Sequence, residues 1–311
     1  MQHKRVIVTG GTGFIGRQTI PFLIDRGYRV HSVGRGKLPL DLAVLERRHP
    51  DHFQHRSLEL LDPIATTEYL KEVKASHLLH LAWDTRHGLF WTSPENTSWL
   101  ESSRALISSF IEHGGSRIVG AGTCAEYEWG ATDLVENKTL LRPSTPYGKA
   151  KLALRDFIRE GGVSNAWGRV FHLFGPYETD KRLVSSACLS LLKGEPFAAT
   201  KGTQVRDFSS TVDVAEGFVA LLDSQVTGDI NIASGEARTI ADILTYLGKL
   251  AGRPELIRLG EREAPPHDPP RITASVARLH DDVGFRYRTS GNERLAETFE
   301  WWKIHGLTPG R

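Results

Sequence analysis

The chain has 311 residues, of which 40% are hydrophobic and 24% charged, and its formal net charge is +2. This composition is typical of a globular protein with a sizeable core, and nucleic acid is not an expected partner, because the basic residues form no long block. No apolar run reaches the roughly 18 residues of a membrane span, and the opening MQHKR leaves no room for a signal peptide, so we expect a cytoplasmic protein with no membrane partner.

The first motif along the chain is VIVTGGTGFIG, residues 6–16. A short β-branched run at Arg5–Thr9 predicts a buried parallel strand, and Phe14–Asp25 predicts a helix. The glycines between them fit both G-x-G-x-x-G and G-x-x-G-x-x-G, turns that let a pyrophosphate approach the backbone at a helix N-terminus. A purely structural turn is the alternative. The predicted dinucleotide contacts are Gly10, Gly13, Phe14, Ile15 and Gly16.

A second strand is expected at Tyr28–Val33, and the residues after it bear on the type of cofactor. An NAD site usually places an acidic residue there for the ribose 2′-hydroxyl, whereas an arginine suits the 2′-phosphate of NADP. The chain has no acid at this point but has Arg35, followed by Lys37. NADP(H) is therefore favoured and NAD(H) remains possible, since Arg35 could also be an ordinary loop residue.

The rest of the chain alternates between strand and helix patterns. Further strands are expected at Phe53–Leu58, His77–Ala82, Arg117–Ala121, Ala166–Phe171 and Asp229–Ile232, with helices that include Asn96–His113 and Thr145–Arg159. This alternation predicts an α/β fold with a Rossmann doubly wound parallel sheet. We expect a dinucleotide-binding domain at residues 1–171, completed by about 206–233. Residues 172–205 and 234–311 would form a smaller, interleaved C-terminal substrate lobe.

The stretch TPYGKAKLAL, residues 145–154, places Tyr147 and Lys151 four residues apart, on one face of the expected helix. A tyrosine with its ordinary pKa near 10 is a poor acid–base catalyst at neutral pH, but a nearby ammonium and a cationic nicotinamide favour its phenolate. Tyr147 could then exchange the proton that accompanies hydride transfer at a carbonyl or alcohol carbon. The pair is weak evidence on its own, because this spacing also occurs by chance.

Seven motifs in a fixed order resemble the extended short-chain dehydrogenase/reductase family, which includes nucleotide-sugar epimerases, dehydratases and 4-keto reductases. They are VTGGTGFIG (8–16), HLLHLAW (77–83), GAGTCAEYEWG (120–130), RPSTPYGKAK (142–151), GRVFHLFGP (168–176), GTQVRDFSSTVDVAEG (202–217) and DINIASGE (229–236). The resemblance covers almost the whole chain. It implies that Thr123, Tyr147 and Lys151 are catalytic, with Thr123 holding the substrate oxygen and Lys151 also binding the nicotinamide ribose.

The resemblance also implies further contacts. Glu59 and Leu60 would lie near the adenine, and Leu81 and Ala82 along the nicotinamide. The implied substrate contacts are Trp83, Thr123, His172, Arg182, Arg206 and Arg271. Alternatives remain for some of them: Arg206 could be a salt-bridge partner of Asp207, and His172 a structural histidine. No metal site is expected, because the two cysteines, Cys124 and Cys188, lack metal-ligand spacing.

Departures from the family pattern narrow the chemistry. Dehydratases follow the catalytic Ser/Thr with an Asp–Glu pair, where this chain has Cys124 and Ala125. Certain 3,5-epimerases carry a catalytic cysteine one residue later than Cys124, and one residue on a strand reverses the side chain, so Cys124 is interpreted as a core residue. Glu126 and Glu128 could contact the substrate or be structural.

The favoured function is an NAD(P)H-dependent reductase of a nucleotide-linked 4-keto-(6-deoxy)hexose. The alternative is an NAD-dependent nucleotide-sugar 4-epimerase, and a third, less favoured possibility is a non-catalytic sensor that binds nucleotide. The nucleotide sugar would be the partner molecule. A homodimer is also expected, since the helices at 96–113 and 145–160 correspond to those through which family members often pair.

Overall fold

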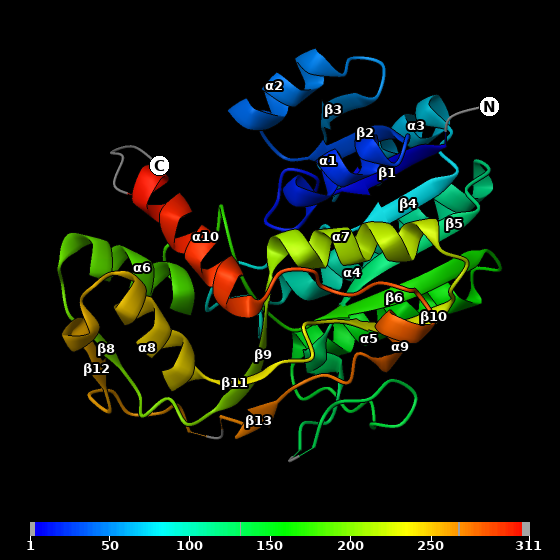
Figure 1. The fold of residues 1–311 in the computed structure, drawn as a ribbon. Coiled ribbons are helices and arrows are strands. Elements are labelled where there is room, and N and C mark those ends of the chain that lie inside the picture. Colours follow the sequence, from blue (N-terminus) through cyan, green and yellow to red (C-terminus); the bar gives the residue numbers. More distant parts are fainter. Residues whose placement is uncertain (1–3, 131, 267, 307–311) are drawn as a thin grey trace.

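A seven-stranded parallel sheet with the order β3-β2-β1-β4-β5-β6-β10 forms the centre of the computed structural model (Figure 1). Its strands are β1 (Arg5–Thr9), β2 (Arg29–Gly34), β3 (Phe53–Ser57), β4 (His77–His80), β5 (Arg117–Thr123), β6 (Ser164–Val170) and β10 (Gly228–Ile232). The structure describes residues 4–130, 132–266 and 268–306. Two expectations touch residues outside this range. The one about a signal peptide includes residues 1–3, and the expected C-terminal lobe includes residues 307–311. The predicted Rossmann fold is confirmed.

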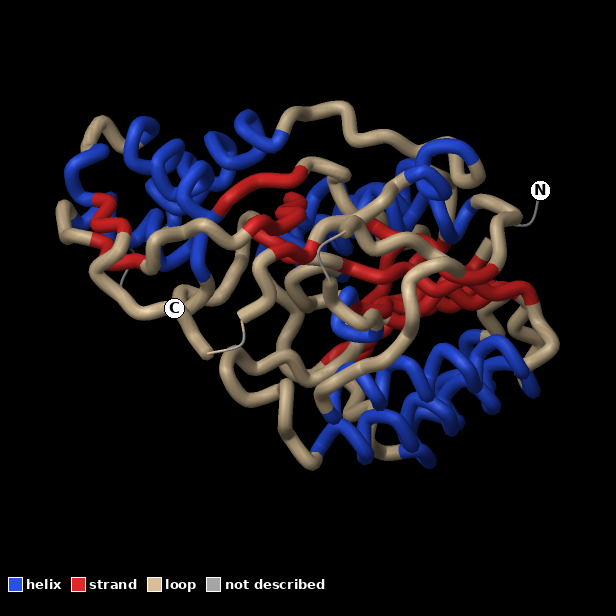
Figure 2. Tube along the Cα trace, turned by 90° about the horizontal axis from the view of Figure 1, so that it is seen from below, coloured by secondary structure: helices blue, strands red, loops and turns tan. Residues whose placement is uncertain are grey.

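Helices cover both faces of this sheet (Figures 1 and 2). One face carries α1 (Gly16–Asp25), α2 (Leu40–Arg48) and α7 (Thr211–Asp223), and the other carries α3 (Pro63–Val73), α4 (Glu95–Glu112) and α5 (Pro146–Glu160). Alternation along β1 divides the core between the two faces, because Val6 and Val8 pack on the α1 side and Ile7 on the α3 side. Within the described residues, the helices are too short or too polar to cross a bilayer.

A smaller sheet is built around β9 (Val205–Ser210), which pairs with β7 (His172–Phe174), β11 (Ala237–Thr239) and β13 (Arg271–Ile272). Beside it lie the pair β8 (Phe197–Ala199) and β12 (Ile257–Leu259), the helices α6 (Leu183–Lys193), α8 (Ile240–Leu250) and α10 (Gly291–His305), and the 3₁₀ turn η2 (Pro254–Leu256). These helices share an apolar cluster that includes Cys188, Leu247 and Trp302. The short helix α9 (Ala277–Asp281) packs near β10.

The hydrogen bonds show how the two parts interleave. Strand β9 joins the smaller sheet, whereas α7 and β10, which follow it, return to the main sheet and its helices. The expected division at residues 171, 206 and 233 stays a prediction. Several strand ends differ from the expectation by one or two residues. The two-residue differences are that β4 stops at His80, because the next backbone N–H groups turn toward Thr9, that β5 continues to Thr123, and that β6 already begins at Ser164.

The glycine turn after β1 is sterically demanding. Gly10 has a φ of +68°, a conformation that side chains disfavour, and a Cβ there would lie 3.0 Å from the backbone of Ala82. A Cβ on Gly16 would overlap the carbonyl of Gly10 and the Cα of Gly11, so only glycine lets α1 start directly against the turn.

We predict that Gly16→Ala lowers the free energy of unfolding by about 2 kcal/mol, because the backbone around Gly10 must move to admit the methyl group. Denaturant unfolding of the purified chain measures the change. Gly130→Ala is the matched control, since a Cβ at Gly130 meets nothing within 4 Å. Equal stabilities for the two variants would contradict the close packing described here.

Candidate active site

A cavity of about 440 Å³ opens at the carboxyl ends of β1, β4 and β5. One wall is the glycine turn and the segment 81–91, and the opposite wall is formed by β7 and the residues that lead into α6. Open α/β sheets bind ligands at the point where successive strands change direction across the sheet. Here that point lies between β1 and β4, because β2 and β3 follow β1 on one side and β5 and β6 follow β4 on the other. The cavity therefore lies where a dinucleotide is expected.

Most of the predicted site residues line this one cavity. They are Gly10, Gly13, Phe14, Ile15, Gly16, Leu81, Ala82, Trp83, Thr123, Tyr147, Lys151, His172 and Arg182. A side chain at Gly13 would fill space beside the turn, since its Cβ would lie 3.0 Å from the Gly10 carbonyl oxygen. Gly13 thus leaves the space beside the turn open at the N-terminus of α1, where the motif predicts a pyrophosphate.

Thr123 ends β5 and begins the 3₁₀ turn η1 (Cys124–Glu126). Its hydroxyl accepts from the N–H of Ala125 at 3.2 Å, and its own N–H donates to Glu126 Oε1 at 2.8 Å. This capping box holds the hydroxyl in a defined direction in the cavity wall.

Tyr147 lies in the first turn of α5, which Thr145 caps by accepting from the N–H of Gly148 at 3.1 Å. Its ring meets those of Phe90 and Trp91 edge-on, with centroids 4.9 and 5.7 Å away. This burial raises the pKa of Tyr147 well above its ordinary value, while the hydroxyl of Thr123 lowers it to a lesser extent. The phenol therefore keeps its proton at neutral pH.

Lys151 lies one turn further along α5, and its ammonium donates to the carbonyl of Ala121 at 2.9 Å. Its Nζ also lies 4.2 Å from the ring centroid of Trp83, whose indole N–H donates to Asn96. Burial lowers the pKa of Lys151 to about 7, against the opposing charge of Glu126. Trp83, expected to bind substrate, thus packs against the lysine. Burial raises the pKa of Tyr147, and the expected effect of a cationic nicotinamide on this phenol stays a prediction.

A buried hydrogen-bond chain behind the cavity was not anticipated from the sequence. Thr9 Oγ1 lies 2.8 Å from His80 Nδ1, and His80 Nε2 lies 3.0 Å from the hydroxyl of Ser103. The same threonine oxygen accepts from the N–H groups of Leu81 and Ala82, both at 3.2 Å. Burial and the charge of Lys151 lower the pKa of His80 to about 3, so the ring is neutral and serves to position residues 81–82.

Glu126, left open between two roles, is structural: its carboxylate is fully buried and accepts from Trp167 Nε1 and from Arg169 Nε. Glu128 instead pairs with exposed Arg142. Cys124 lines the cavity but begins η1, so the strand alternation used to interpret it does not apply. Burial raises the pKa of its thiol to about 12, which keeps it protonated and unreactive.

The remaining predicted residues are not part of the cavity wall. Arg35 follows β2 with an exposed side chain 4.0 Å from Glu59, and Leu60 packs in the core beneath α3. Arg206 is buried and pairs with Asp268 at 2.6 Å rather than with Asp207. Arg271 pairs with Asp133 at 2.8 Å.

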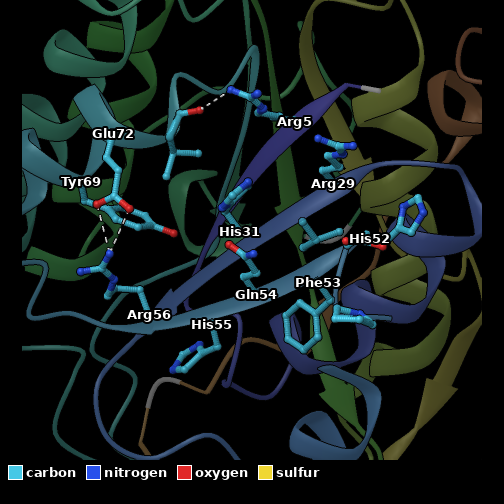
Figure 3. Close-up of a pocket in the computed structure, with 14 residues that line it drawn as sticks. Arg5, Arg29, His31, His52, Phe53, Gln54, His55, Arg56, Tyr69 and Glu72 are labelled. Carbon is cyan, nitrogen blue, oxygen red and sulfur yellow. Dashed lines mark hydrogen bonds and ion pairs between the residues drawn. The ribbon is translucent and has the colours of Figure 1, made fainter. Parts of the chain in front are cut away.

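A second cavity, of about 370 Å³, lies on the sheet face beside α3 and is lined by the first residues of β1, β2 and β3 (Figure 3). Its arginines are largely engaged, because Arg56 pairs with Glu72 and Arg5 donates to the carbonyl of Val73. It contains none of the predicted site residues. Over the described part of the chain, no three His, Cys, Asp or Glu side chains gather in a way that could hold a metal ion.

Comparison with known proteins agrees with this geometry. A putative UDP-arabinose 4-epimerase of Arabidopsis thaliana is 23% identical over an alignment of 336 positions, gaps included, which covers 96% of this chain and 76% of that protein. A UDP-glucose 4-epimerase of Thermotoga maritima, solved with UDP-glucose, has the same fold, with a TM-score of 0.86 at 20% identity over 96% of this chain and 99% of that one. MoeE5, solved with UDP-glucuronic acid and NAD, has a TM-score of 0.82 at 26% identity, with 96% and 99% covered.

The family model for the NAD dependent epimerase/dehydratase family matches residues 6–233. This match spans the glycine turn, the strand β5 that ends at Thr123 and the helix α5 that carries Tyr147 and Lys151. It confirms the family resemblance that the motifs indicate. The chain belongs to the NAD dependent epimerase/dehydratase family of enzymes.

Proposed function

We propose that this chain reduces the keto group of a nucleotide-linked 4-keto-(6-deoxy)hexose, with NADPH as the hydride source. The observation that carries the proposal is the gathering of Thr123, Tyr147 and Lys151 in one cavity beside the glycine turn. The resemblance to the family implies that these three residues catalyse oxidation or reduction at a single carbon of the sugar. The departures at Cys124 and Ala125 leave no acid–base pair for water loss.

In the proposed mechanism, the hydroxyl of Thr123 holds the ketone oxygen within reach of Tyr147. A nicotinamide cofactor, when bound, would be the source of the hydride, and the phenol of Tyr147 would give its proton to the ketone oxygen as the hydride arrives at the carbon. Lys151 holds the nicotinamide ribose and places a positive charge beside the reacting oxygen. Gly10, Gly13 and Gly16 provide the backbone surface for the pyrophosphate.

The protonation state of Tyr147 is compatible with the reductive step. Its pKa lies above neutral pH, so the side chain is a phenol and can donate a proton. Oxidation of a sugar hydroxyl would instead require the phenolate as a base.

A 4-epimerase is the second candidate, and the relatives favour it. The Arabidopsis and Thermotoga proteins are named as 4-epimerases of UDP-arabinose and UDP-glucose. An epimerase would use the same three residues in both directions and would retain its cofactor, whereas a reductase exchanges it. UDP is accordingly the first nucleotide to test.

Tyr147→Phe is expected to lower turnover by at least a hundredfold, because it removes the proton donor. NADPH oxidation with a UDP- or dTDP-linked 4-keto-6-deoxyhexose measures this, and NADPH titration verifies that cofactor binding persists. Interconversion of UDP-glucose and UDP-galactose with tightly bound NAD, and no NADPH oxidation, would establish the epimerase instead. Unchanged turnover in the variant would exclude the mechanism for either reaction.

Arg35→Asp is expected to weaken NADPH binding by at least tenfold and to leave NADH binding equal or tighter. The exposed guanidinium of Arg35 lies 4.0 Å from the carboxylate of Glu59 and 5.9 Å from the ring centroid of Trp99, and these long contacts can give way to a 2′-phosphate. Fluorescence titration with both cofactors measures the ratio. Arg48→Asp, an exposed exchange on α2, controls for overall charge. A parent protein that prefers NADH would rule out the NADPH assignment.

Lys151 is also expected to reduce the stability of the folded chain. Its pKa falls from 10.5 to about 7 on folding, so the unfolded chain binds more protons between these values and stability rises with pH across this window. Lys151→Met should therefore raise the melting temperature by roughly 3–5 °C at pH 6. The gain should shrink as the pH rises toward 10.5 and vanish only above it, where the lysine is neutral in the unfolded chain as well. A gain independent of pH would contradict the assigned burial cost.

A further inference from the structure

The cavity of about 370 Å³ beside α3 brings together positive charges that the candidate active site does not use (Figure 3). The pairing of the strands explains why they meet. Arg5 is paired with Arg29, and His31, two residues further along β2, is paired with Ile7 and Gln54. Because side chains alternate along a strand and Ile7 packs on the α3 side, these side chains all lie on that side of the sheet.

The charges of Arg5 and Arg29 have no carboxylate to pair with. Arg5 donates to the backbone carbonyl of Val73 at 3.1 Å, which offers only the partial negative charge at the end of α3. Arg29 is exposed and makes no hydrogen bond or ion pair with any residue that the structure describes. Like charges directly opposite each other on neighbouring strands repel, so this pair costs free energy as it stands.

The acidic residues of the cavity do not remove this excess charge. Glu72 accepts from Arg56 at 3.1 and 3.2 Å, so these two side chains neutralise each other (Figure 3). Asp51 is exposed in the turn before β3 and forms no ion pair within the described part of the chain. Arg5 and Arg29 are therefore left without a counter-ion.

His31 responds to the field of these charges. Burial lowers its pKa below the ordinary value, Arg5 and Arg29 lower it further, and Glu72 acts in the opposite direction. Of the other neighbours that line the cavity, Arg56 of β3 is paired with this acid. A positive potential that disfavours a proton on an imidazole favours an anion at the same place.

Tyr69 of α3 adds a buried hydrogen-bond donor. The residue is only 7% exposed, yet its hydroxyl makes no hydrogen bond among the described residues and points into the cavity (Figure 3). Burial raises its pKa to about 12, so the hydroxyl keeps its proton. A buried donor without a partner costs free energy, and an oxyanion beside the two arginines would satisfy it.

We propose that this cavity binds a phosphate dianion, either free or as the end group of a phosphate monoester. The guanidinium groups of Arg5 and Arg29 would bind its oxygens, and the hydroxyl of Tyr69 would donate to it. Arginine suits this ligand because its planar fork donates two parallel hydrogen bonds to a phosphate. The inference does not rest on the proposed function, since this cavity and the active-site cavity have no lining residue in common.

The test is calorimetric titration of the whole chain at pH 7.5 and constant ionic strength, with inorganic phosphate, glucose 6-phosphate or glucose as the probe. We expect the two phosphates to bind at one site and glucose not to bind. Binding should persist when NADP⁺ is added, because the glycine turn lies at the other end of β1. Tighter binding of glucose 6-phosphate would identify a monoester as the ligand, and tighter binding of phosphate the free ion.

Three variants identify the residues responsible. Arg29→Gln should weaken phosphate binding at least tenfold and raise the melting temperature of the phosphate-free chain, because the repulsion with Arg5 ends. Tyr69→Phe should weaken binding several-fold, since it removes one donor and keeps the ring. Arg258→Gln, an exposed exchange on β12, is the matched control and should bind phosphate as the parent does.

A magnetic resonance titration of the His31 ring supplies a readout at the site itself. Bound phosphate should raise the pKa of His31 in the parent, because it offsets the two arginine charges, and should raise it less in Arg29→Gln. Absence of binding, equal affinity in the parent, Arg29→Gln and Tyr69→Phe, or loss of binding on addition of NADP⁺ would overturn the proposal. Melting curves verify that each variant is folded.

Discussion

The ion pair between Glu126 and Arg169 holds the carboxyl ends of β5 and β6 together at the candidate site. Both side chains are fully buried, and Oε2 and Nε lie 2.7 Å apart. Arg169 also pairs with Asp229 of β10 at 3.0 Å, and Asp229 pairs in turn with Arg155 of α5 at the same distance. Breaking a buried pair by removing one partner typically costs about 3–5 kcal/mol, because the other charge is left without compensation.

This network connects the parts of the site that must keep a fixed geometry. Glu126 accepts a hydrogen bond from the backbone N–H of Thr123. Arg155, through its bond to Asp229, ties β10 to the helix that carries Tyr147 and Lys151. The hydroxyl on β5 and the phenol on α5 are thus positioned through one set of charges in the core. Rigid support of this kind is what acid–base chemistry needs, since proton transfer depends on hydrogen-bond distances.

The central sheet, and the part of the candidate site formed by the glycine turn and α5, could be predicted from the sequence, because the patterns that indicate them are local. A β-branched run followed by glycines, and a tyrosine four residues before a lysine, each lie within a few positions. The strands outside the central sheet escaped prediction. Two or three residues in β7, β8, β11, β12 and β13 carry no periodic pattern, and the six residues of β9, VRDFSS, do not alternate between apolar and polar side chains. Long-range pairing was also out of reach: Arg206 meets Asp268, which lies 62 residues further along the chain, rather than its neighbour Asp207. Burial explains the differences at Tyr147 and Lys151, because residue spacing says nothing about desolvation.

The pairing of β9 with β7, β11 and β13 has a consequence for the order in which the molecule can assemble during synthesis. The glycine turn after β1 packs against Ala82 at the end of β4, and most of the main sheet is complete by β6. The smaller sheet, in contrast, needs β13 (Arg271–Ile272), so it can close only after almost the whole chain has been synthesised. The cavity wall that β7 contributes therefore reaches its final pairing later than the wall built from the glycine turn and β4.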